Sequence, residues 1–164
     1  MYYRVEQFIS AITAKMTKED TDYVKGLLNE KEQELFFKLK VYEQVHCLRV
    51  ARNMDAESGV FNIKERWELS RIALLHDIGK IKYPLNPIEK SIIVVLNKLT
   101  KGKIRKLTKL KMVKCYYTHA QEGAALLAEI GTYNEDFLEA IRTHHDVDIT
   151  SEKMNLLQKC DNAA

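Results

Sequence analysis

Residues that interrupt helices are scarce in this 164-residue sequence, which has only two prolines, Pro84 and Pro87, and six glycines. Sustained alternation of polar and apolar residues is also scarce, whereas apolar residues recur at three- and four-residue intervals in nearly every segment. These features argue against a sheet-rich chain and predict an all-α fold. The length predicts one domain over 1–164, with 1–30 as a helical extension packed on the core.

Cysteines and long apolar runs are few. Cys47, Cys115 and Cys160 are widely separated and form no CxxC pair, which argues against a disulfide framework or a zinc–thiolate site. The longest apolar run, IIVV from Ile92 to Val95, is far too short to cross a bilayer. The start of the chain, MYYRVEQFIS, lacks the apolar core of a signal peptide. We therefore expect a cytoplasmic protein with no membrane partner.

Acidic residues are missing from one stretch, Lys90 to Gln121, which contains nine lysines or arginines and no Asp or Glu. Outside it, 17 basic residues stand against 23 acidic ones. Such a basic segment indicates local attraction for a phosphate-bearing ligand, or simply a solvated helix face, and both readings stay open. Because no nucleic-acid-binding motif accompanies the charges, dedicated nucleic-acid binding is disfavoured.

Periodicity and capping residues predict where the helices lie. We expect helices over 3–16, from Thr17 onward with Asp20 completing a capping box, and over 32–54, 63–77, 87–99, 109–130, 134–145 and 151–162. Asn86 and Asn134 are expected N-caps, and Gly79 is an expected helix terminator. Two inward stripes are predicted: Tyr42, Val45, His46, Arg49 and Asn53, and then Ile63, Trp67, Ser70, Leu74 and Asp77.

The five histidines lie on apolar stripes or at the ends of predicted helices. A lone histidine on an apolar face is usually a hydrogen-bonded core residue, but five together make that explanation unattractive. Asp77 adjoins one of them in the stretch ALLHDIGK, and Asp161 lies on the inward stripe of the last helix. Unpaired buried imidazoles and carboxylates would each cost a few kcal/mol, a cost that shared cations would remove. The candidate ligands are His46, His76, Asp77, His119, His144, His145 and Asp161.

The type and number of these ligands indicate the kind of metal site. Imidazole and carboxylate groups suit iron, manganese, zinc or cobalt, and no thiolate cluster competes. Seven ligands are too many for one tetrahedral zinc. They suit two metals about 3.5–4 Å apart, bridged by a carboxylate and a water-derived hydroxide. The pattern therefore predicts a two-metal hydrolytic site.

The order of these residues resembles the HD-domain metal-dependent phosphohydrolase superfamily, of which HDIGK, at His76–Lys80, is the most recognisable local signature. The stretches EQVHCLRVA, THAQEGAALL, IRTHHD and LLQKCD resemble its flanking motifs in the expected order. The resemblance covers roughly 35–161. It implies a bundle of seven to eight helices around a central metal site.

The presence of His119, His144 and His145 resembles the binuclear subset of that superfamily, which includes cyclic-dinucleotide phosphodiesterases and dinucleoside-tetraphosphate hydrolases. The resemblance assigns one metal to His46, His76, Asp77 and Asp161, and a second to His119, His144 and His145, with Asp77 bridging. Iron or manganese is favoured, with zinc, cobalt or nickel as alternatives. The GYP motif of the cyclic-di-GMP branch is absent after His119, which disfavours that substrate.

The implied activity is hydrolysis of a phosphodiester or phosphoanhydride bond in a nucleotide, with a metal-bridging hydroxide as nucleophile. Asp77 would orient the nucleophile, and Lys80 would hold a non-bridging phosphate oxygen unless it is a solvated helix-end lysine. Arg49 would hold phosphate or pair with a ligand carboxylate. Further substrate contacts are expected from a basic rim formed by Lys103, Arg105 and Lys106.

Two other functions stay open from the sequence. One is a di-iron HD-fold oxygenase, although an extra histidine at the second metal would fill a position that dioxygen needs. The other is a non-catalytic nucleotide-sensing module, although degenerate members lose ligands and this chain has kept all of them. The apolar residues of the first thirty positions would cover the core or form a homodimer contact, and spacing does not distinguish the two.

Overall fold

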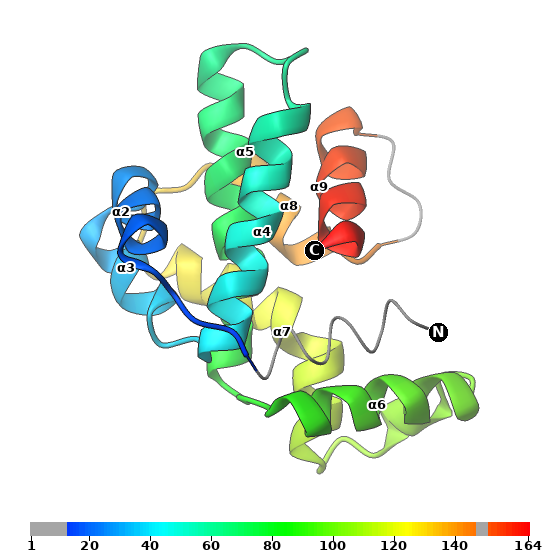
Figure 1. The fold of residues 1–164 in the computed structure, drawn as a ribbon. Helices are drawn as coiled ribbons and strands as arrows, with labels where there is room; N and C mark the ends of the chain where they lie inside the picture. Colours follow the sequence, from blue (N-terminus) through cyan, green and yellow to red (C-terminus); the bar gives the residue numbers. More distant parts are fainter. Residues whose placement is uncertain (1–12, 147–150) are drawn as a thin grey trace.

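The computed structural model describes residues 13–146 and 151–164 (Figure 1). Within these ranges it contains eight α-helices, two short 3-10 helices and no β-strand, which confirms the predicted all-α class. The α-helices are α2 (Lys18–Leu27), α3 (Glu30–Phe36), α4 (Val41–Glu57), α5 (Ile63–Leu75), α6 (Pro87–Leu99), α7 (Lys111–Ala128), α8 (Glu135–Thr143) and α9 (Glu152–Ala163). The 3-10 helices are η1 (Ile78–Ile81) and η2 (Lys103–Lys106).

The main core is built around α4 and α5, which pack against each other (Figure 1). α9 packs on α4, and α7 packs on both η1 and α8. Phe36, Met54, Leu74, Leu127 and Ile141 are fully or almost fully buried in this core. Burial of one such side chain contributes about 1.5–3 kcal/mol, so this core holds together the helices that bear the candidate ligands.

A second, smaller core lies between α6, η2 and the first half of α7. Its buried members are Leu85, Ile93, Ile104, Val113 and Cys115. Figure 1 shows α6 at the lower end of the molecule, below the main helical bundle. The basic stretch of the sequence therefore coincides with a separate packing unit.

The predicted helix over 32–54 is wrong in one respect, because the chain breaks between α3 and α4. Phe37 closes α3, and Lys40 has an extended backbone with ψ 143° before α4 begins. The amide of Gln44 donates hydrogen bonds to the carbonyls of Phe37 and Leu39, at 3.4 and 2.8 Å. The side chain of a later residue thus satisfies carbonyls that the break leaves unpaired.

The two predicted inward stripes are also partly wrong. Arg49 is exposed, and α4 instead buries a face that includes Cys47, Leu48 and Ala51. Ile63 and Trp67 are 85% and 48% exposed because the first turns of α5 extend beyond the main core. Periodicity located the helices correctly, but the residues that each helix buries differ in part from the predicted inward stripe.

Several helix ends match their predictions. Thr17 and Asp20 form a capping box, as do Asn86 and Glu89 ahead of Pro87, and Asn134 caps α8. The predicted helix over 3–16 lies largely outside the described residues, and 13–16 are not helical. α5 stops at Leu75 and α8 at Thr143, two residues earlier than expected.

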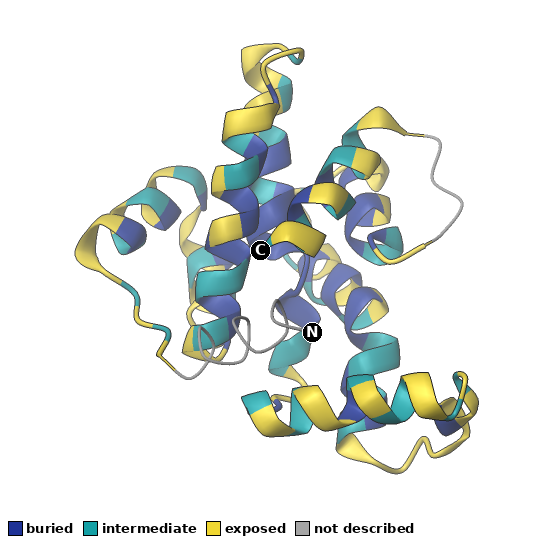
Figure 2. Ribbon diagram, turned by 45° about the vertical axis from the view of Figure 1, so that its right-hand side comes forward, coloured by how far each residue is buried: buried dark blue, intermediate teal, exposed yellow. Residues whose placement is uncertain are grey.

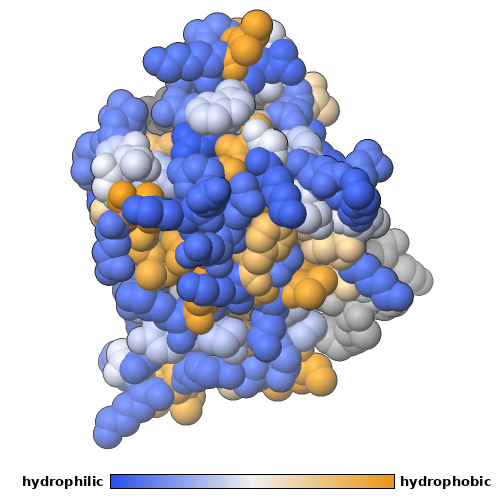
Figure 3. All heavy atoms as spheres, turned by 90° about the vertical axis from the view of Figure 1, so that its left-hand side faces the viewer, coloured by the Kyte–Doolittle hydropathy of each residue, from blue (hydrophilic) through white to orange (hydrophobic). Residues whose placement is uncertain are grey.

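No helix in the described ranges is both long and apolar enough to span a bilayer. Figure 2 shows that the buried residues lie on the inward sides of α4, α5 and α7, while exposed residues cover their outer sides. The face drawn in Figure 3 is largely hydrophilic, with apolar areas scattered over it.

Candidate metal centre

The seven predicted ligands, which come from distant parts of the sequence, meet where α4, α5, α7, α8 and α9 converge. His46 lies on α4, His76 and Asp77 at the junction of α5 with η1, His119 on α7, His144 and His145 at the end of α8, and Asp161 on α9. Two groups of them have donor atoms within 4.8 Å of one another: His46, His76 and Asp161, and then Asp77, His119, His144 and His145.

Asp77 lies between the two groups and presents one carboxylate oxygen to each. Its Oδ2 is 3.4 Å from Nε2 of His76 and 3.7 Å from Nε2 of His46. Its Oδ1 is 3.3 Å from Nε2 of His119 and 3.8 Å from Nε2 of His144. A carboxylate in this position is suited to bridging two cations.

Three of the histidines have their tautomer fixed by the backbone. Nδ1 of His76, His119 and His144 lies 2.7–2.8 Å from the carbonyl oxygens of Ala73, Cys115 and Ile141. Since a carbonyl only accepts, each Nδ1 must donate a proton, so the neutral form of each ring has its lone pair on Nε2. Backbone orientation of metal-binding imidazoles is the usual arrangement around metal ions in proteins.

Polar atoms left without partners point to a cation at this place. Nε2 of His76, Nε2 of His144 and Oδ1 of Asp77 are buried and make no hydrogen bond. Each such atom would normally cost about 1–3 kcal/mol. Three of them within one cluster of nitrogen and oxygen donors fit one or more divalent transition metals, which would satisfy them at once.

His145 and His46 are the two histidines of the cluster that are not fully buried. Nε2 of His145 is 3.0 Å from Nε2 of His119, although His145 is exposed and its neighbour His144 is buried. Adjacent residues in a helix project about 100° apart, so both reach the cluster only because α8 ends at Thr143. Nε2 of His46 is 2.8 Å from Oδ1 of Asp161.

The electrostatic environment keeps the acids charged and several imidazoles neutral. Burial alone would raise the pKa of Asp77, but Lys80 and His76 hold it well below its usual range. Burial lowers the pKa of His144 well below its usual value, and burial together with His119 lowers that of His145 to about 4. His76 differs: although burial would lower its pKa, the neighbouring Asp77 raises it well above the usual value, so a bound cation would have to displace a proton from this ring. Charged carboxylates and neutral imidazoles are the protonation states that metal binding requires.

A network of ion pairs connects Asp77 to α6 through Lys80, which the sequence predicted as a site residue, and through Glu43 and Lys90, which it did not. Nζ of Lys80 contacts Oδ2 of Asp77 and lies 3.1 Å from Oε2 of Glu43. Nζ of Lys90, on α6, is 3.2 Å from both oxygens of the same Glu43. Although burial would raise the pKa of Glu43, the two lysines lower it to about 2. The sequence did contain a signal for Glu43: it lies three residues before His46, and this spacing places the two side chains on adjoining faces of one helix.

Two glycines allow α7 to approach η1 closely enough to bring His119 to Asp77. A Cβ added to Gly79 would lie 1.9 Å from the backbone oxygen of His119 and 2.5 Å from the backbone nitrogen of Gly123. Gly79 lies inside η1 and does not have a positive φ. Its predicted role as the terminator of the helix over 63–77 is wrong, because α5 already ends at Leu75 and Gly79 serves the close packing of η1 on α7.

The predicted substrate contacts other than Lys80 lie outside this cluster. Arg49 is exposed one turn after His46. Lys103, Arg105 and Lys106 are exposed on η2, where the guanidinium of Arg105 lies over the ring of Tyr117 at 5.5 Å from its centroid. The fully buried Cys47, which the sequence did not mark as a candidate ligand, has its Sγ within 4.8 Å of donor atoms of His76 and Asp77.

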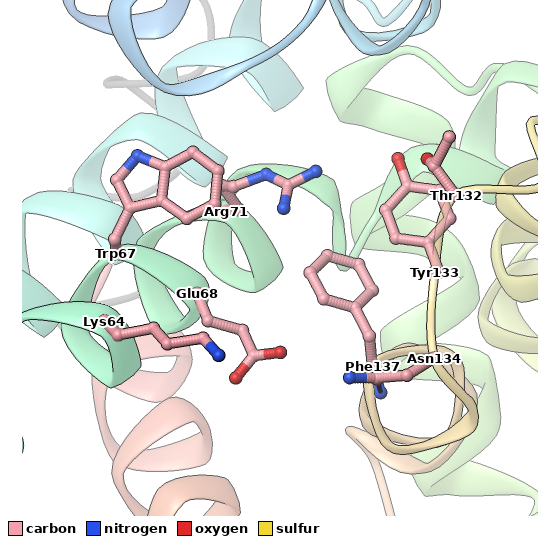
Figure 4. Close-up of a pocket in the computed structure, with 8 residues that line it drawn as sticks. All are labelled: Lys64, Trp67, Glu68, Arg71, Thr132, Tyr133, Asn134 and Phe137. Atoms are coloured by element: carbon pink, nitrogen blue, oxygen red, sulfur yellow. Dashed lines mark hydrogen bonds between the residues drawn. The ribbon is translucent and has the colours of Figure 1, made fainter.

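A separate pocket lies between α5 and the segment leading into α8 (Figure 4). The guanidinium of Arg71 lies 4.6 Å from the ring centroid of Trp67 and 5.4 Å from that of Phe137. Arg71 also pairs with the fully buried carboxylate of Glu32. These contacts tie α3, α5 and α8 together, and none of the seven candidate ligands lines this pocket.

Comparison with known families agrees with this geometry. The family model described as HD domain matches residues 44–163, which is most of the chain and includes all seven candidate ligands. Comparisons with curated proteins and with solved structures found no match. HD domains are generally metal-dependent phosphohydrolases that bind divalent ions. On the extent of this match, the chain belongs to the HD-domain family.

Proposed function

We propose that the protein is a binuclear metal-dependent phosphohydrolase that cleaves a phosphodiester or phosphoanhydride bond in a nucleotide-type substrate. The observation that supports this most strongly is the position of Asp77, whose two carboxylate oxygens face different groups of histidines. A single ion would need only one of these groups. The full ligand set, including His145, favours hydrolysis over an oxygenase reaction.

The donors divide into two sets around Asp77. His46, His76 and Asp161 would hold one ion, and His119, His144 and His145 the other, with Asp77 shared between them. Imidazole and carboxylate donors without a thiolate cluster favour iron or manganese. When bound, such ions supply Lewis acidity toward phosphoryl oxygens and lower the pKa of water.

The surrounding residues would orient the substrate and the attacking water. Asp77 is almost completely buried at the junction of α5 with η1, where its two carboxylate oxygens face the two groups of histidines. Lys80 lies at the edge of the cluster, where its ammonium could pair with a non-bridging phosphate oxygen. Glu43 holds that ammonium from the other side and would position it when the carboxylate of Asp77 is shared with ions.

A phosphate-rich substrate also agrees with the charge of the neighbouring region. Residues 90–121 contain nine basic and no acidic residues, and their helices adjoin the cluster through Lys90 and His119. A positive field near the site would raise the local concentration of an anionic nucleotide. We include Arg49, Lys103, Arg105 and Lys106 as candidate contacts for the parts of the substrate farther from the cluster.

Hydrolysis tests this proposal directly. Protein loaded with manganese would be incubated with cyclic dinucleotides, dinucleoside polyphosphates and mononucleotides, and products would be followed by chromatography. We expect turnover of at least one substrate, a loss of about 10³-fold or more in Asp77→Asn, and little change in Asp136→Asn, an exposed aspartate of α8. Oxygen uptake in place of hydrolysis, or tight nucleotide binding without turnover by the metal-loaded protein, would contradict the proposal.

A further inference from the structure

His145 differs from the other two histidines of its group in how its ring is held. Nδ1 of His119 and Nδ1 of His144 each donate to a backbone carbonyl one turn earlier in the chain, at 2.8 and 2.7 Å. Within the described part of the chain, no backbone carbonyl accepts a hydrogen bond from the ring of His145. The direction of that ring therefore depends on the backbone that carries it.

The backbone on both sides of His145 is held by one side chain from another helix. The amide nitrogen Nε2 of Gln158, on α9, donates to the carbonyl oxygen of His144 at 2.9 Å and to that of Asp146 at 2.8 Å. The backbone N–H of Asp146 donates to the carbonyl of Thr143 at 2.8 Å, which closes the turn after α8. Because α8 ends at Thr143, the carbonyls that Gln158 binds have no partner inside that helix.

The chemistry of the Gln158 side chain suits this task. A primary amide carries two N–H groups on one nitrogen, so it can donate to two carbonyls at once. A carboxylate of the same shape only accepts and would be repelled by both carbonyls, while an aliphatic side chain would donate to neither. The preceding residue, Leu157, is 1% exposed and belongs to the main core, so α9 is anchored to the rest of the fold at this point.

The same helix also reaches the other group of candidate ligands. Asp161 lies three residues after Gln158, and its Oδ1 is 2.8 Å from Nε2 of His46. Residues three apart lie on the same side of a helix. α9 therefore presents a carboxylate to one group of ligands and an amide to the backbone of the other.

We propose that Gln158 is a positioning residue for the second ion of the centre, and that it acts by fixing the backbone around His145 so that this ring faces the cluster. The inference rests on the two-ion centre proposed above and is independent of the substrate. Groups that orient metal ligands contribute about 10–100-fold to metal affinity. Loss of the Gln158 amide should therefore weaken the binding of one ion and leave the ion on the side of His46 in place.

Calorimetric titration of the metal-free full chain with Mn²⁺ tests the proposal. We expect the parent protein to bind two ions, and Gln158→Leu to bind one of them about 10–100-fold less tightly with an unchanged affinity for the other. Asn155→Leu is the matched control, since it removes an exposed amide from the same helix, and it should leave both affinities unchanged.

A double substitution tests whether the effect passes through the histidine. His145→Ala should weaken the same ion as Gln158→Leu does. Adding Gln158→Leu to His145→Ala should then change neither affinity by more than about threefold, because the ligand that the amide positions is already gone. A Gln158→Leu effect that keeps its full size in this background would overturn the proposal.

Gln158→Glu provides a second variant, of the same shape but without a donor, and it should show the same selective loss. Circular dichroism checks that each variant is folded. Two ions bound with unchanged affinities in both variants would refute the role of Gln158 alone. Equal weakening of both ions, or loss of folding in both variants, would mean that the residue serves the fold and would also refute it. A parent protein that binds one ion would contradict the two-ion centre itself, and the inference with it.

Discussion

At the scale of single residues, a glycine determines how closely two helical segments meet. Gly79 lets η1 lie against the backbone of α7 at His119 and Gly123, and this contact sets the position of His119 relative to Asp77. The neighbouring atoms belong to the main chain, so a side chain at position 79 has no room to displace them.

We therefore expect Gly79→Ala to reduce the free energy of unfolding by at least about 2 kcal/mol, as overpacking in a close contact does. Urea denaturation measures this change. Gly26→Ala in α2 is the control, since no atom lies within 4 Å of the added Cβ there, and it should stabilise the protein slightly. Equal effects of the two substitutions would show that the close approach does not constrain the fold.

The buried carboxylate of Glu43 should give stability a specific pH dependence. Its pKa is lowered to about 2 from an ordinary 4.5 by the ammonium groups of Lys80 and Lys90, despite burial. Because the folded protein favours the ionised form of Glu43, this residue stabilises the folded state at pH values above 4.5, its pKa in the unfolded chain. This stabilisation is lost as the pH falls from 4.5 toward 2.

Glu43→Gln should therefore be less stable than the parent at pH 7 by an amount on the order of 3 kcal/mol, and the difference should shrink below pH 4.5. Urea denaturation at several pH values between 7 and 3 measures it. Glu34→Gln, an exposed position on α3, should show no comparable trend. A difference that stays constant down to pH 3 would argue against the ion pairs as its source.

At the scale of helices, local sequence signals predicted where helices start better than where a predicted helix is interrupted. Asn86, Pro87 and Asn134 occupy their predicted capping positions because capping depends on neighbours within one turn. The break between α3 and α4 contains neither proline nor glycine. It arises from burial of Phe36 and Leu39 and from hydrogen bonds by Gln44, which no periodicity in the sequence reveals.

Gln44→Ala should destabilise the protein by about 1–2 kcal/mol, because it leaves the carbonyls of Phe37 and Leu39 without their side-chain donor. Thermal or urea unfolding gives the value. Gln121→Ala, at an exposed position of α7, provides the comparison and should change stability by less than about 0.5 kcal/mol. If both substitutions were neutral, the break would be stabilised by apolar burial alone.

At the scale of the whole molecule, the candidate centre depends on contacts between distant parts of the chain. His46 and Asp161 are 115 positions apart, yet their side chains meet at 2.8 Å. The sequence predicted the members of the cluster, because histidines and aspartates on inward faces need partners. It did not predict Glu43 or Lys90, since their roles depend on how α6 lies against α4, which local patterns do not specify.

The smaller core around Ile93 illustrates the same limit. The sequence showed that residues 90–121 are basic. The structure shows that this segment builds a packing unit of its own, which leaves several apolar residues of α6 exposed and is linked to the metal centre through Lys90. Charge composition is a property of a segment, whereas the direction in which the segment faces is a property of the fold.

The most direct test of the account is the number of metal ions per chain, measured by mass spectrometry on protein purified without oxygen or chelator. We predict close to two transition-metal ions, falling to about one in His119→Ala and staying near two in the Gln121→Ala control. One ion in the parent protein would contradict the binuclear assignment. No ion, even after incubation with manganese or iron, would contradict the metal centre itself.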